Sequence, residues 1–568
     1  METNYLSEVR EELGSKGDER PTSGFLAWVV VAFIAALILR LLWIFHWPLS
    51  IESEGVYYAR IAENLIAGRG YVGAREAGKQ LLYPPLYPVL IAGVTEFVRN
   101  SELAGRIVSV ICGTLWIVPL MFITRSVLDE TAGVISGIIT AFGPPMIAIS
   151  CTVQSEPAYL VFQAAGIFFA LHVWSNLSKW NSYLAGLSFG IAYLARPEAS
   201  IYVALTALFI PLFVQKGSRF RILARLALAF GITILPYITW LSIQTGSPRL
   251  EAKSVSNYVE ATGWAAHLPP GQIFFAVDNQ LNDVGLSNQS DLAMIQKTKL
   301  STRKVFWLAM HGASVNVKRL LSTILESRLF GGSLFVLLVG FGLISPVESR
   351  EMLVRRGFLC AAFLASIVPL LSLHAFHDRF VFPFLTILIP FAAGGVVHLY
   401  RSSTAILAAW SRERLLYAFA YSALGAAIAS IVSLSYLATE AHAMLHLDTD
   451  ARLPEQDITV RRGDVVIKNI GLKIRSFGVK DALVIDGTPA IGYYAGASDW
   501  PLPYCDGETA VRYIAKKKPD FIVLESTQAE VFPYLNDWLQ NGIPDAHTKL
   551  IAKTTYPDGR IVEIYRRQ

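Results

Sequence analysis

Long apolar stretches restrict this chain to membrane folds. A membrane-spanning helix needs about 20 mostly apolar residues, and about eleven segments come close to that length. They cover residues 25–45, 104–124, 131–150, 157–175, 182–196, 199–214, 222–243, 330–345, 354–373, 380–399 and 415–438. Only 16% of the residues are charged, against about 25% in soluble proteins. The expected fold class is therefore an α-helical polytopic membrane protein with about eleven transmembrane helices.

The distribution of basic residues predicts the orientation of these helices. Cytoplasmic loops are enriched in Lys and Arg. Alternate short loops carry Arg125, Arg355, Arg356 and Arg401, whereas loop 151–156 has no basic residue. This pattern places the N-terminus in the cytoplasm, and an odd number of helices places the C-terminus outside. No stripe of Lys and Arg with interleaved aromatics is present, so no nucleic-acid partner is expected.

The same reasoning divides the chain into segments. Residues 1–24 are expected to form a cytoplasmic tail, and 25–440 the transmembrane domain. That domain includes a first long loop, 46–103, and a second long loop, 246–328, both expected on the extracytoplasmic side.

Residues 455–568 differ in pattern and are expected to form a small extracytoplasmic α/β domain. The expected strands are 482–486 and 520–526, the expected helices 508–518 and 529–541, and a terminal hairpin turns at Pro557-Asp558-Gly559. No glycine-rich phosphate loop is present. A supporting role is therefore expected for this domain.

The first long loop begins with an unusual polar stretch, SIESEGVYYARIAENLIAGRGY, at residues 50–71. Tyr58, Ile61, Ala62 and Leu65 share one helical face. A second apolar helix is expected within 81–98, opened by a proline pair. We expect both helices to lie along the outer membrane surface.

Further polar clusters fall at other expected outer helix ends. They are Ser155-Glu156-Pro157, Arg196-Pro197-Glu198 and His377-Asp378-Arg379-Phe380. A single glutamate after a helix is most often a solvated interfacial residue. Charged groups beside hydrocarbon are nevertheless costly and tend to be functional, so their convergence on one membrane face predicts a polar site there.

These motifs resemble those of the GT-C membrane glycosyltransferases, in the protein O-mannosyltransferase, aminoarabinose transferase and RgtABCD-like branches. The resemblance rests on Glu-x-x-x-Tyr-Ala-x-Ile-Ala at 54–62, YPPLYP at 83–88, SEP at 155–157, LARPEA at 194–199 and HDRFVFP at 377–383. It implies transfer of a sugar from a polyprenyl phosphate to an acceptor on the extracytoplasmic side of the inner membrane. The acceptor class is left open between an envelope glycan, a lipid and a protein.

Two positions depart from the family pattern. The acid of the first loop is usually Asp and is Glu54 here. In the aminoarabinose branch a Lys precedes the proline pair, where this chain has Tyr83, and Lys79 lies four residues earlier. The second departure argues against that particular sugar.

The chemistry of the reaction assigns roles to these residues. A carboxylate can remove the proton of an acceptor hydroxyl, and Glu54 is the candidate base, with Glu52 as the second candidate. Arg can hold a phosphate with two parallel hydrogen bonds, which favours Arg379 for the donor phosphate. Weaker candidates for the phosphate are His377, Arg196, Lys79 and Arg60.

Other roles stay open. For Arg196 with Glu198, a structural ion pair is an equal alternative. Glu156 is expected to hold the acceptor, orient a cation or share a divalent metal ion with Glu54, and the metal requirement is unknown. Tyr58 and Tyr83 are expected to support the site, whereas Arg40 and Arg106 are expected to snorkel toward the membrane surface.

Two other functions are alternatives. A secondary transporter of a polar or lipid-linked substrate would place its polar site near the bilayer midplane, on broken helices in inverted repeats. No internal repeat is visible, and the candidate residues lie at helix ends. A noncatalytic membrane scaffold that binds partners through its C-terminal domain is the second alternative.

Overall fold

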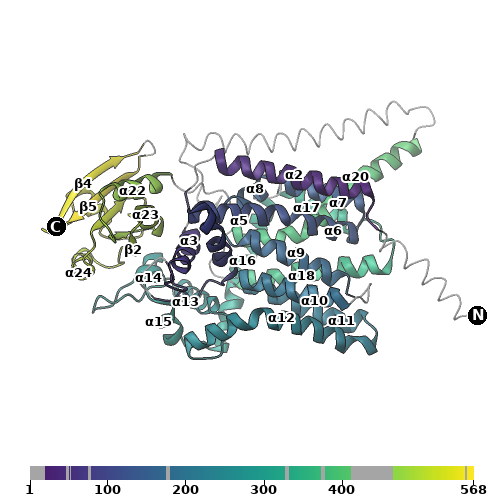
Figure 1. Cartoon of the computed structure of the whole chain (residues 1–568), viewed down its shortest axis with the longest axis horizontal. Coiled ribbons are helices and arrows are strands. Elements are labelled where there is room, and N and C mark those ends of the chain that lie inside the picture. The colour runs from purple at the N-terminus through teal and green to yellow at the C-terminus, as the bar shows by residue number, and fades with distance from the viewer. Residues whose placement is uncertain are drawn as a thin grey trace, which may run out of the picture.

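The computed structural model describes residues 20–46, 50–51, 53–73, 78–173, 179–326, 332–372, 378–410, 465–556 and 559–568. Roughly parallel helices form a bundle, and a sheet-containing C-terminal unit (465–568) lies at one end of it (Figure 1). The helices of the N-terminal half are α2 (Ser23–His46), α3 (Ser53–Ile66), α4 (Leu86–Val98), α5 (Ser101–Leu115), α6 (Ile117–Val127), α7 (Glu130–Phe142), α8 (Pro144–Ser150), α9 (Glu156–Leu171), α10 (Lys179–Ala195), η1 (Pro197–Ala199), α11 (Ser200–Phe213) and α12 (Lys216–Thr245).

The chain continues through the second long loop and back into the bundle. These helices are α13 (Lys253–Ala265), α14 (Pro270–Phe275), α15 (Asp291–Lys297), α16 (Thr302–Glu326), α17 (Ser333–Leu343), α18 (Arg350–Ser372), α19 (Asp378–Leu385), η3 (Thr386–Leu388) and α20 (Ile389–Trp410). Figure 1 shows α3, α13, α14 and α15 between the bundle and the C-terminal unit.

The described parts of the apolar segments expected up to residue 399 are largely helical, and segment 415–438 lies outside the described residues. Among the described residues, four helices are long and apolar enough to cross a membrane on their own: Ser23–Phe45, Ser101–Val127, Lys216–Thr245 and Val381–Thr404. The bent pair α7–α8 raises the number to five if it counts as one span. The prediction of a helical membrane protein is thus confirmed in its coarse form.

A buried arginine compensates for the bend between α7 and α8. The two helices meet at 59°, and α8 opens with Pro144 and Pro145. Prolines lack an N–H, so the carbonyls of Thr140 and Ala141, four residues earlier, receive no helical hydrogen bond from them. The Arg40 guanidinium donates to these two carbonyls at 3.1 and 3.4 Å.

The expectation that Arg40 and Arg106 snorkel is wrong. Arg40 is fully buried, because its guanidinium is needed at the α7–α8 bend. Arg106 is also buried and donates to Glu102 at 2.6 Å, one turn earlier in α5. Both arginines therefore find their partners inside the protein instead of reaching for the membrane surface.

The arginines of the predicted cytoplasmic loops gather at one end of the bundle. Arg125 pairs with Glu130 at 3.0 Å, and Arg401 pairs with the adjacent Asp129 at 2.8 Å. Arg355 and Arg356 donate to the carbonyls of residues 126 and 127. The loops that the basic-residue pattern groups together thus meet in space.

The first long loop folds as two helices, as the sequence predicts. In α3, Tyr58, Ile61 and Ala62 are buried. The second helix, α4, begins directly after Pro85. The buried face of α3 packs against α4, α5 and α23 of the C-terminal unit, so Tyr58 lies inside the protein instead of at the lipid surface.

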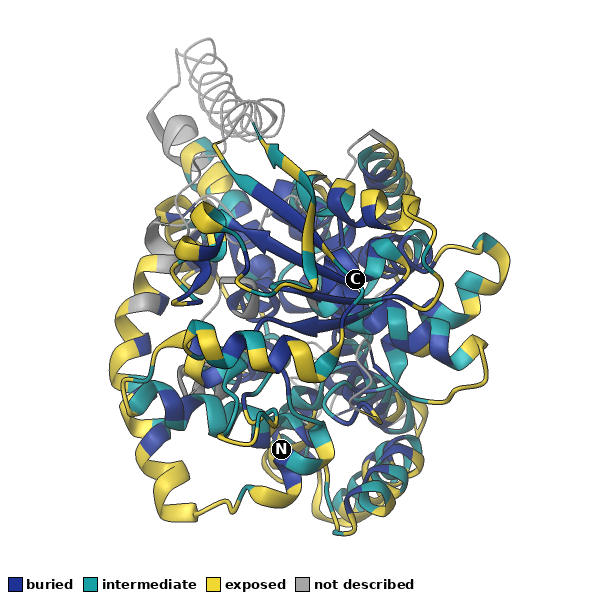
Figure 2. Ribbon diagram, turned by 90° about the vertical axis from the view of Figure 1, so that its left-hand side faces the viewer, coloured by how far each residue is buried: buried dark blue, intermediate teal, exposed yellow. Residues whose placement is uncertain are grey.

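The C-terminal unit contains a five-stranded mixed sheet in the order β2-β1-β3-β5-β4. Strand β1 pairs parallel with β2 and β3, while β3–β5 and β4–β5 are antiparallel. Figure 2 views this unit end-on, with the inner strands buried. Its elements are α22 (Val465–Ser476), β1 (Leu483–Asp486), α23 (Pro489–Ala495), β2 (Ser498–Pro501), α24 (Gly507–Lys517), β3 (Phe521–Glu525), η5 (Ser526–Gln528), α25 (Leu535–Asn541), β4 (Thr548–Thr555) and β5 (Ile561–Arg567).

The observed elements of this unit differ from the expected ones in two ways. The short strand β2 and the helices α22 and α23 were not expected. The expected helix 529–541 is shorter, because α25 begins only at Leu535. Pro533 cannot donate a backbone hydrogen bond inside a helix, so the helix starts after it.

Candidate active site

Glu54 lies in the first turn of α3, where it meets the second long loop. Its Oε1 is 3.6 Å from Nζ of Lys253, the first residue of α13. The two side chains are 20% and 34% exposed, so the pair is reachable from solvent. Lys253 Nζ also lies 5.8 Å from the ring centre of Tyr83. The predicted base is thus placed against a cation and an aromatic ring.

A cluster of tyrosines lies near Glu54. The Tyr58 ring meets Tyr83 and Tyr87 edge-on, with ring centroids 5.1 Å apart in both pairs. The Tyr58 hydroxyl donates to Ser155 Oγ at 3.2 Å, which connects α3 to the start of α9. Burial, together with the nearby carboxylates of Glu54 and Glu156, raises the pKa of Tyr58 well above its usual range. Tyr58 is therefore a neutral hydrogen-bond donor between the two acids.

The second acidic motif forms a buried ion pair. Glu156 is the first residue of α9, where the helix dipole favours a negative charge. Arg196 donates to Glu156 Oε1 at 2.7 Å and to Glu198 Oε1 at 3.5 Å. The Glu156 side chain is only 1% exposed, and within the described part of the chain its Oε2 has no hydrogen-bond partner. This buried carboxylate oxygen can therefore accept a hydrogen bond or bind a cation.

Asp291 joins the two long loops beside this cluster. Its Oδ2 accepts hydrogen bonds from Gln80 Nε2 at 2.7 Å and from the backbone N–H groups of Leu81 and Leu82 at 2.7 and 3.3 Å. These residues directly precede Tyr83. Burial raises the pKa of Asp291 to about 6, against the opposing effect of the two backbone hydrogen bonds. Lys79 makes a further contact by donating to Gln244 at the end of α12.

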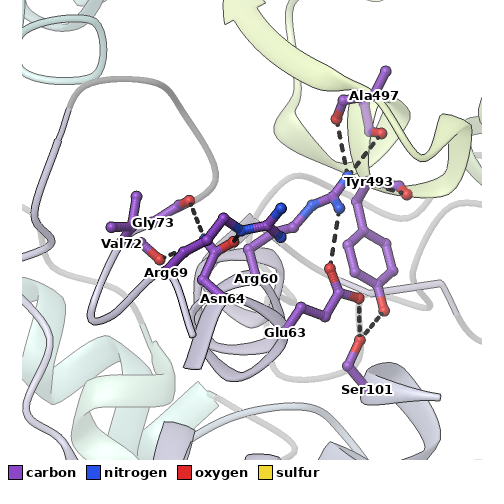
Figure 3. Close-up of polar contacts among 10 residues, drawn as sticks. Arg60, Glu63, Asn64, Arg69, Val72, Gly73, Ser101, Tyr493 and Ala497 are labelled. Carbon is purple, nitrogen blue, oxygen red and sulfur yellow. Dashed lines mark hydrogen bonds and ion pairs between the residues drawn. The ribbon is translucent and has the colours of Figure 1, made fainter. Parts of the chain in front are cut away.

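The structure brings together Glu54, Tyr58, Tyr83, Glu156 and Arg196 from the candidates chosen on sequence grounds. Lys79 lies on the same loop but bonds to Gln244. Arg60 points elsewhere, toward the C-terminal unit (Figure 3).

The remaining candidates are not placed by the structure. Glu52 and His377 lie outside the described residues. For Arg379, only the backbone is described, within α19. Their predicted roles stay predictions.

Sequence reasoning missed Lys253 and Asp291. Neither belongs to a motif that distinguishes it from other charged residues of the second long loop. Asp291 follows Ser290, whose side chain caps α15, and this pair is a recognisable helix start. That signal predicts a helix but not a contact with the first long loop.

The described residues contain no group of three or more His, Cys, Asp or Glu side chains that could bind a metal ion. Glu156 Oε2 is suited to be one ligand. A metal shared by Glu54 and Glu156 would need further ligands from outside the described part of the chain or from a substrate, so no catalytic step is assigned to it below.

Comparison with known proteins gives a family match over part of the chain. The sequence model of the dolichyl-phosphate-mannose-protein mannosyltransferase family matches residues 83–242. This segment includes Tyr83, Glu156 and Arg196 and begins after Glu54. A search of curated protein sequences gives no significant match.

Solved structures with a similar fold cover most of the chain. The oligosaccharyltransferase of Archaeoglobus fulgidus, crystallised with Zn and sulfate, has a TM-score of 0.52 and 14% identity over 87% of this chain and 67% of its own. ArnT from Cupriavidus metallidurans in the apo state also has a TM-score of 0.52 and 14% identity, over 95% of this chain and 98% of its own. ArnT bound to undecaprenyl phosphate has the same identity and coverage, with a TM-score of 0.50.

These findings confirm the predicted resemblance and its fold. The chain has the GT-C fold. Within that class, the matched segment is similar to the dolichyl-phosphate-mannose-protein mannosyltransferases.

Proposed function

We propose that this protein transfers a sugar from a polyprenyl-phosphate donor to an acceptor of the cell envelope, which is a glycan, a lipid or a protein. The observation that carries the proposal is the position of Glu54, which is partly exposed and paired with Lys253 at 3.6 Å. Glu54 also interacts electrostatically with Arg196 of the buried Glu156–Arg196 pair. A carboxylate and a cation side by side match a reaction that removes a proton and releases a phosphate. The similar ArnT structure contains undecaprenyl phosphate, which supports a lipid donor.

The proposed reaction takes place at the extracytoplasmic surface of the inner membrane. The predicted orientation, with eleven spans and a cytoplasmic N-terminus, puts the arginine-rich end of the bundle in the cytoplasm. The end with Glu54 and the C-terminal unit then faces outward. An extracytoplasmic site meets a lipid donor anchored in the bilayer and an acceptor at the membrane surface.

Glu54 acts as the general base in this mechanism. Its carboxylate takes the proton from the acceptor hydroxyl while the hydroxyl oxygen attacks the anomeric carbon of the sugar. A new glycosidic C–O bond forms, and the bond between the anomeric carbon and the phosphate oxygen breaks. The proton ends on Glu54, and the electron pair leaves with the lipid phosphate.

Cations stabilise the leaving phosphate. Negative charge grows on its bridging oxygen, and preorganised positive groups can supply a large part of catalysis. Lys253 is a cation beside Glu54, and Arg379 remains the predicted bidentate partner. Arg196 already pairs with Glu156 and Glu198, which favours a structural role for it.

The proposal is tested with membranes containing the full chain and a panel of radiolabelled polyprenyl-phosphate sugars. Transfer of label to an endogenous acceptor supports the proposal. Uptake without transfer would favour the secondary transporter, and neither transfer nor uptake from any donor would favour a scaffold.

Substitution of the base sharpens this test. Glu54→Gln keeps the size of the side chain but cannot accept the proton, so turnover should fall by roughly 10²–10⁴-fold with near-normal donor binding. Glu54→Asp should retain partial activity, and Glu52→Gln should have a much smaller effect. Glu96→Gln, at an exposed position of α4, is the matched control. Equal, small losses at Glu54 and Glu96 would remove Glu54 from the mechanism.

A further inference from the structure

The C-terminal unit contacts the helix that carries Glu54. Figure 3 shows polar contacts of this interface, in which side chains of α3 reach the C-terminal end of α23 and the start of α5. Apolar residues complete it, since Val56 and Ala59 of α3 belong to one buried cluster with Ala490 and Tyr494 of α23. The unit is thus packed directly onto the first long loop.

Arg60 supplies most of the polar contact. Its guanidinium donates to the carbonyls of Gly492, Tyr493 and Ala497 at 3.1, 3.4 and 2.9 Å. Two of these carbonyls lie in the last turn of α23 and that of Ala497 lies just beyond it, where the helix dipole favours a cation. The same guanidinium pairs with Glu63 at 3.0 Å. With these partners, Arg60 serves to attach α3 to the unit.

A closed set of hydrogen bonds fixes the rotation of α3. Glu63 accepts from Ser101 Oγ at 2.6 Å, and Ser101 Oγ lies 2.7 Å from the Tyr493 hydroxyl. The Arg60 guanidinium in turn lies 5.1 Å from the centre of the Tyr493 ring. Rotation of α3 about its axis would break several of these contacts at once, because they share residues.

Tyr494 holds the chain immediately before Glu54. Its hydroxyl accepts a hydrogen bond from the backbone N–H of Ile51 at 2.7 Å, three residues ahead of the proposed base. On the other side, a Cβ at Gly55 would come within 2.8 Å of the Val153 carbonyl, so α3 starts in close contact with the segment before Glu156. The start of α3 is therefore confined between Tyr494 and residue 153.

The unit is also joined to the second long loop, which supplies Lys253. The backbone N–H of Tyr504 donates to the Phe275 carbonyl at 2.8 Å. The Asp283 carboxylate accepts from Tyr513 at 2.8 Å and from Lys517 at 2.7 Å. One folded unit therefore contacts both loops whose residues meet at Glu54 and Lys253.

We propose that the C-terminal unit positions the catalytic carboxylate, with Tyr494 and Arg60 as positioning residues that act through α3. The catalytic part of this statement rests on the proposed function, whereas the effect on α3 does not. The unit is accordingly a part of the active-site architecture, and its contribution applies to every acceptor. Tyr494 sets the start of α3, and Arg60 sets its rotation.

Hydrogen exchange measures the structural part on the full-length protein in nanodiscs. Tyr494→Phe removes only the hydroxyl, and Tyr565→Phe removes a buried hydroxyl that bonds to Glu563 within β5, far from α3 in sequence and not bonded to it. Exchange in peptides covering residues 50–66 should become faster in Tyr494→Phe by a few-fold to about tenfold, as expected for one lost hydrogen bond. Tyr565→Phe should leave these peptides unchanged.

Arg60 provides a second and independent pair of variants. Arg60→Gln removes the charge and most donors, while Arg60→Lys keeps the charge but loses the planar fork. Exchange of α3 should be fastest in Arg60→Gln and intermediate in Arg60→Lys. Exchange of α3 that is unchanged in Tyr494→Phe and in Arg60→Gln would overturn the proposal.

Steady-state kinetics test whether the position of α3 affects the rate of sugar transfer. With a donor that the wild-type protein uses, Tyr494→Phe should lower kcat by a few-fold to about tenfold, with KM for the donor within about twofold of wild type. Tyr565→Phe should keep both constants. A rise in KM alone, or equal losses in the two variants, would contradict a positioning role. A wild-type protein that uses no donor would instead refute the proposed function, and the exchange result would still decide the effect on α3.

Discussion

Glu54 Oε1 and Lys253 Nζ lie 3.6 Å apart, although one belongs to the first long loop and the other to the second. The pair is partly exposed, and ion pairs of this kind contribute little to stability. In the proposed mechanism its importance is chemical, because the two loops bring together a carboxylate that would remove a proton and a cation that would meet a phosphate.

Replacement of Lys253 should affect turnover more than folding. Lys253→Gln removes the cation, and turnover should fall about tenfold or more, since preorganised charges of this kind are worth that much in other enzymes. The free energy of unfolding should change by less than about 1 kcal/mol. Initial rates and thermal unfolding of the same preparations provide the two measurements.

Lys473→Gln is the control for this experiment, because Lys473 is an exposed residue of α22. It should leave both quantities unchanged. Lys253→Arg should preserve part of the activity, since it retains the positive charge. Wild-type turnover in Lys253→Gln would show that this cation takes no part in the reaction.

The raised pKa of Asp291, which joins the two long loops, leads us to expect that the stability of the protein depends on pH. Its pKa is raised to about 6 from an ordinary value of about 3.9, so the folded protein binds this proton more tightly than the unfolded chain. Stability from this group is therefore highest below about pH 4 and is lost as the pH rises to about 6. Asp291→Asn has no such proton, so the difference in unfolding midpoint between wild type and variant should change across this window and be constant above it.

The three hydrogen-bond donors all meet Oδ2 of Asp291, which leaves Oδ1 to carry the proton. The asparagine amide oxygen can accept the same bonds, so Asp291→Asn is a mild substitution. A difference in midpoint that is independent of pH from 4 to 7 would contradict the raised pKa of Asp291.

Much of the fold could be predicted because its elements follow local rules. The length of the apolar segments predicted the helices of the bundle, and the proline pair at 84–85 predicted the start of α4. Short apolar runs predicted the strands β1 and β3. Arg40 could not be predicted in the same way. Its partners are carbonyls one hundred residues away at a proline-dependent bend, and only the packing of α2 against α7 and α8 brings them together.

Residues of the candidate site could be predicted only where they belong to a recognisable motif. Glu54, Tyr58, Glu156 and Arg196 stand in recognisable patterns, and they do converge. Lys253 has no motif, and its role depends on how two loops about 200 residues apart in sequence dock on each other. Arg60 shows the opposite case, because a basic residue in the first long loop is used to hold the C-terminal unit.

The buried Glu156–Arg196 pair predicts an asymmetric pattern of destabilisation. Arg196→Ala leaves a carboxylate that is 1% exposed without its 2.7 Å partner, and breaking a buried pair in this way costs about 3–5 kcal/mol. Glu156→Gln leaves a neutral amide, and Arg196 keeps Glu198. Thermal unfolding in detergent should therefore show a larger loss for Arg196→Ala.

The double variant Arg196→Ala with Glu156→Gln completes this experiment. Because the two residues contact each other, their effects should not add, and the double variant should be more stable than the sum of the single losses predicts. Additive losses, or a larger loss for Glu156→Gln alone, would show that the pair does not hold α9 and η1 together.

The orientation of the protein can be tested with two exposed positions at opposite ends of the bundle. Asn279 lies in the second long loop, four residues before Asp283, which binds the C-terminal unit. Ser403 lies on α20, next to the Arg401–Asp129 pair. Ser155, although closer to the site, is buried and cannot react with a reagent in solution.

A membrane-impermeant maleimide on intact cells should label Asn279→Cys and not Ser403→Cys, in a background that lacks Cys112, Cys151, Cys360 and Cys505. The physical reason is the enrichment of Lys and Arg in cytoplasmic loops, which places the arginine-rich end of the bundle inside. Permeabilised cells should show equal labelling at both positions, which confirms that both thiols are accessible. Labelling at Ser403→Cys alone in intact cells would put Glu54 and Lys253 in the cytoplasm, and a reaction outside the membrane would then have to be abandoned.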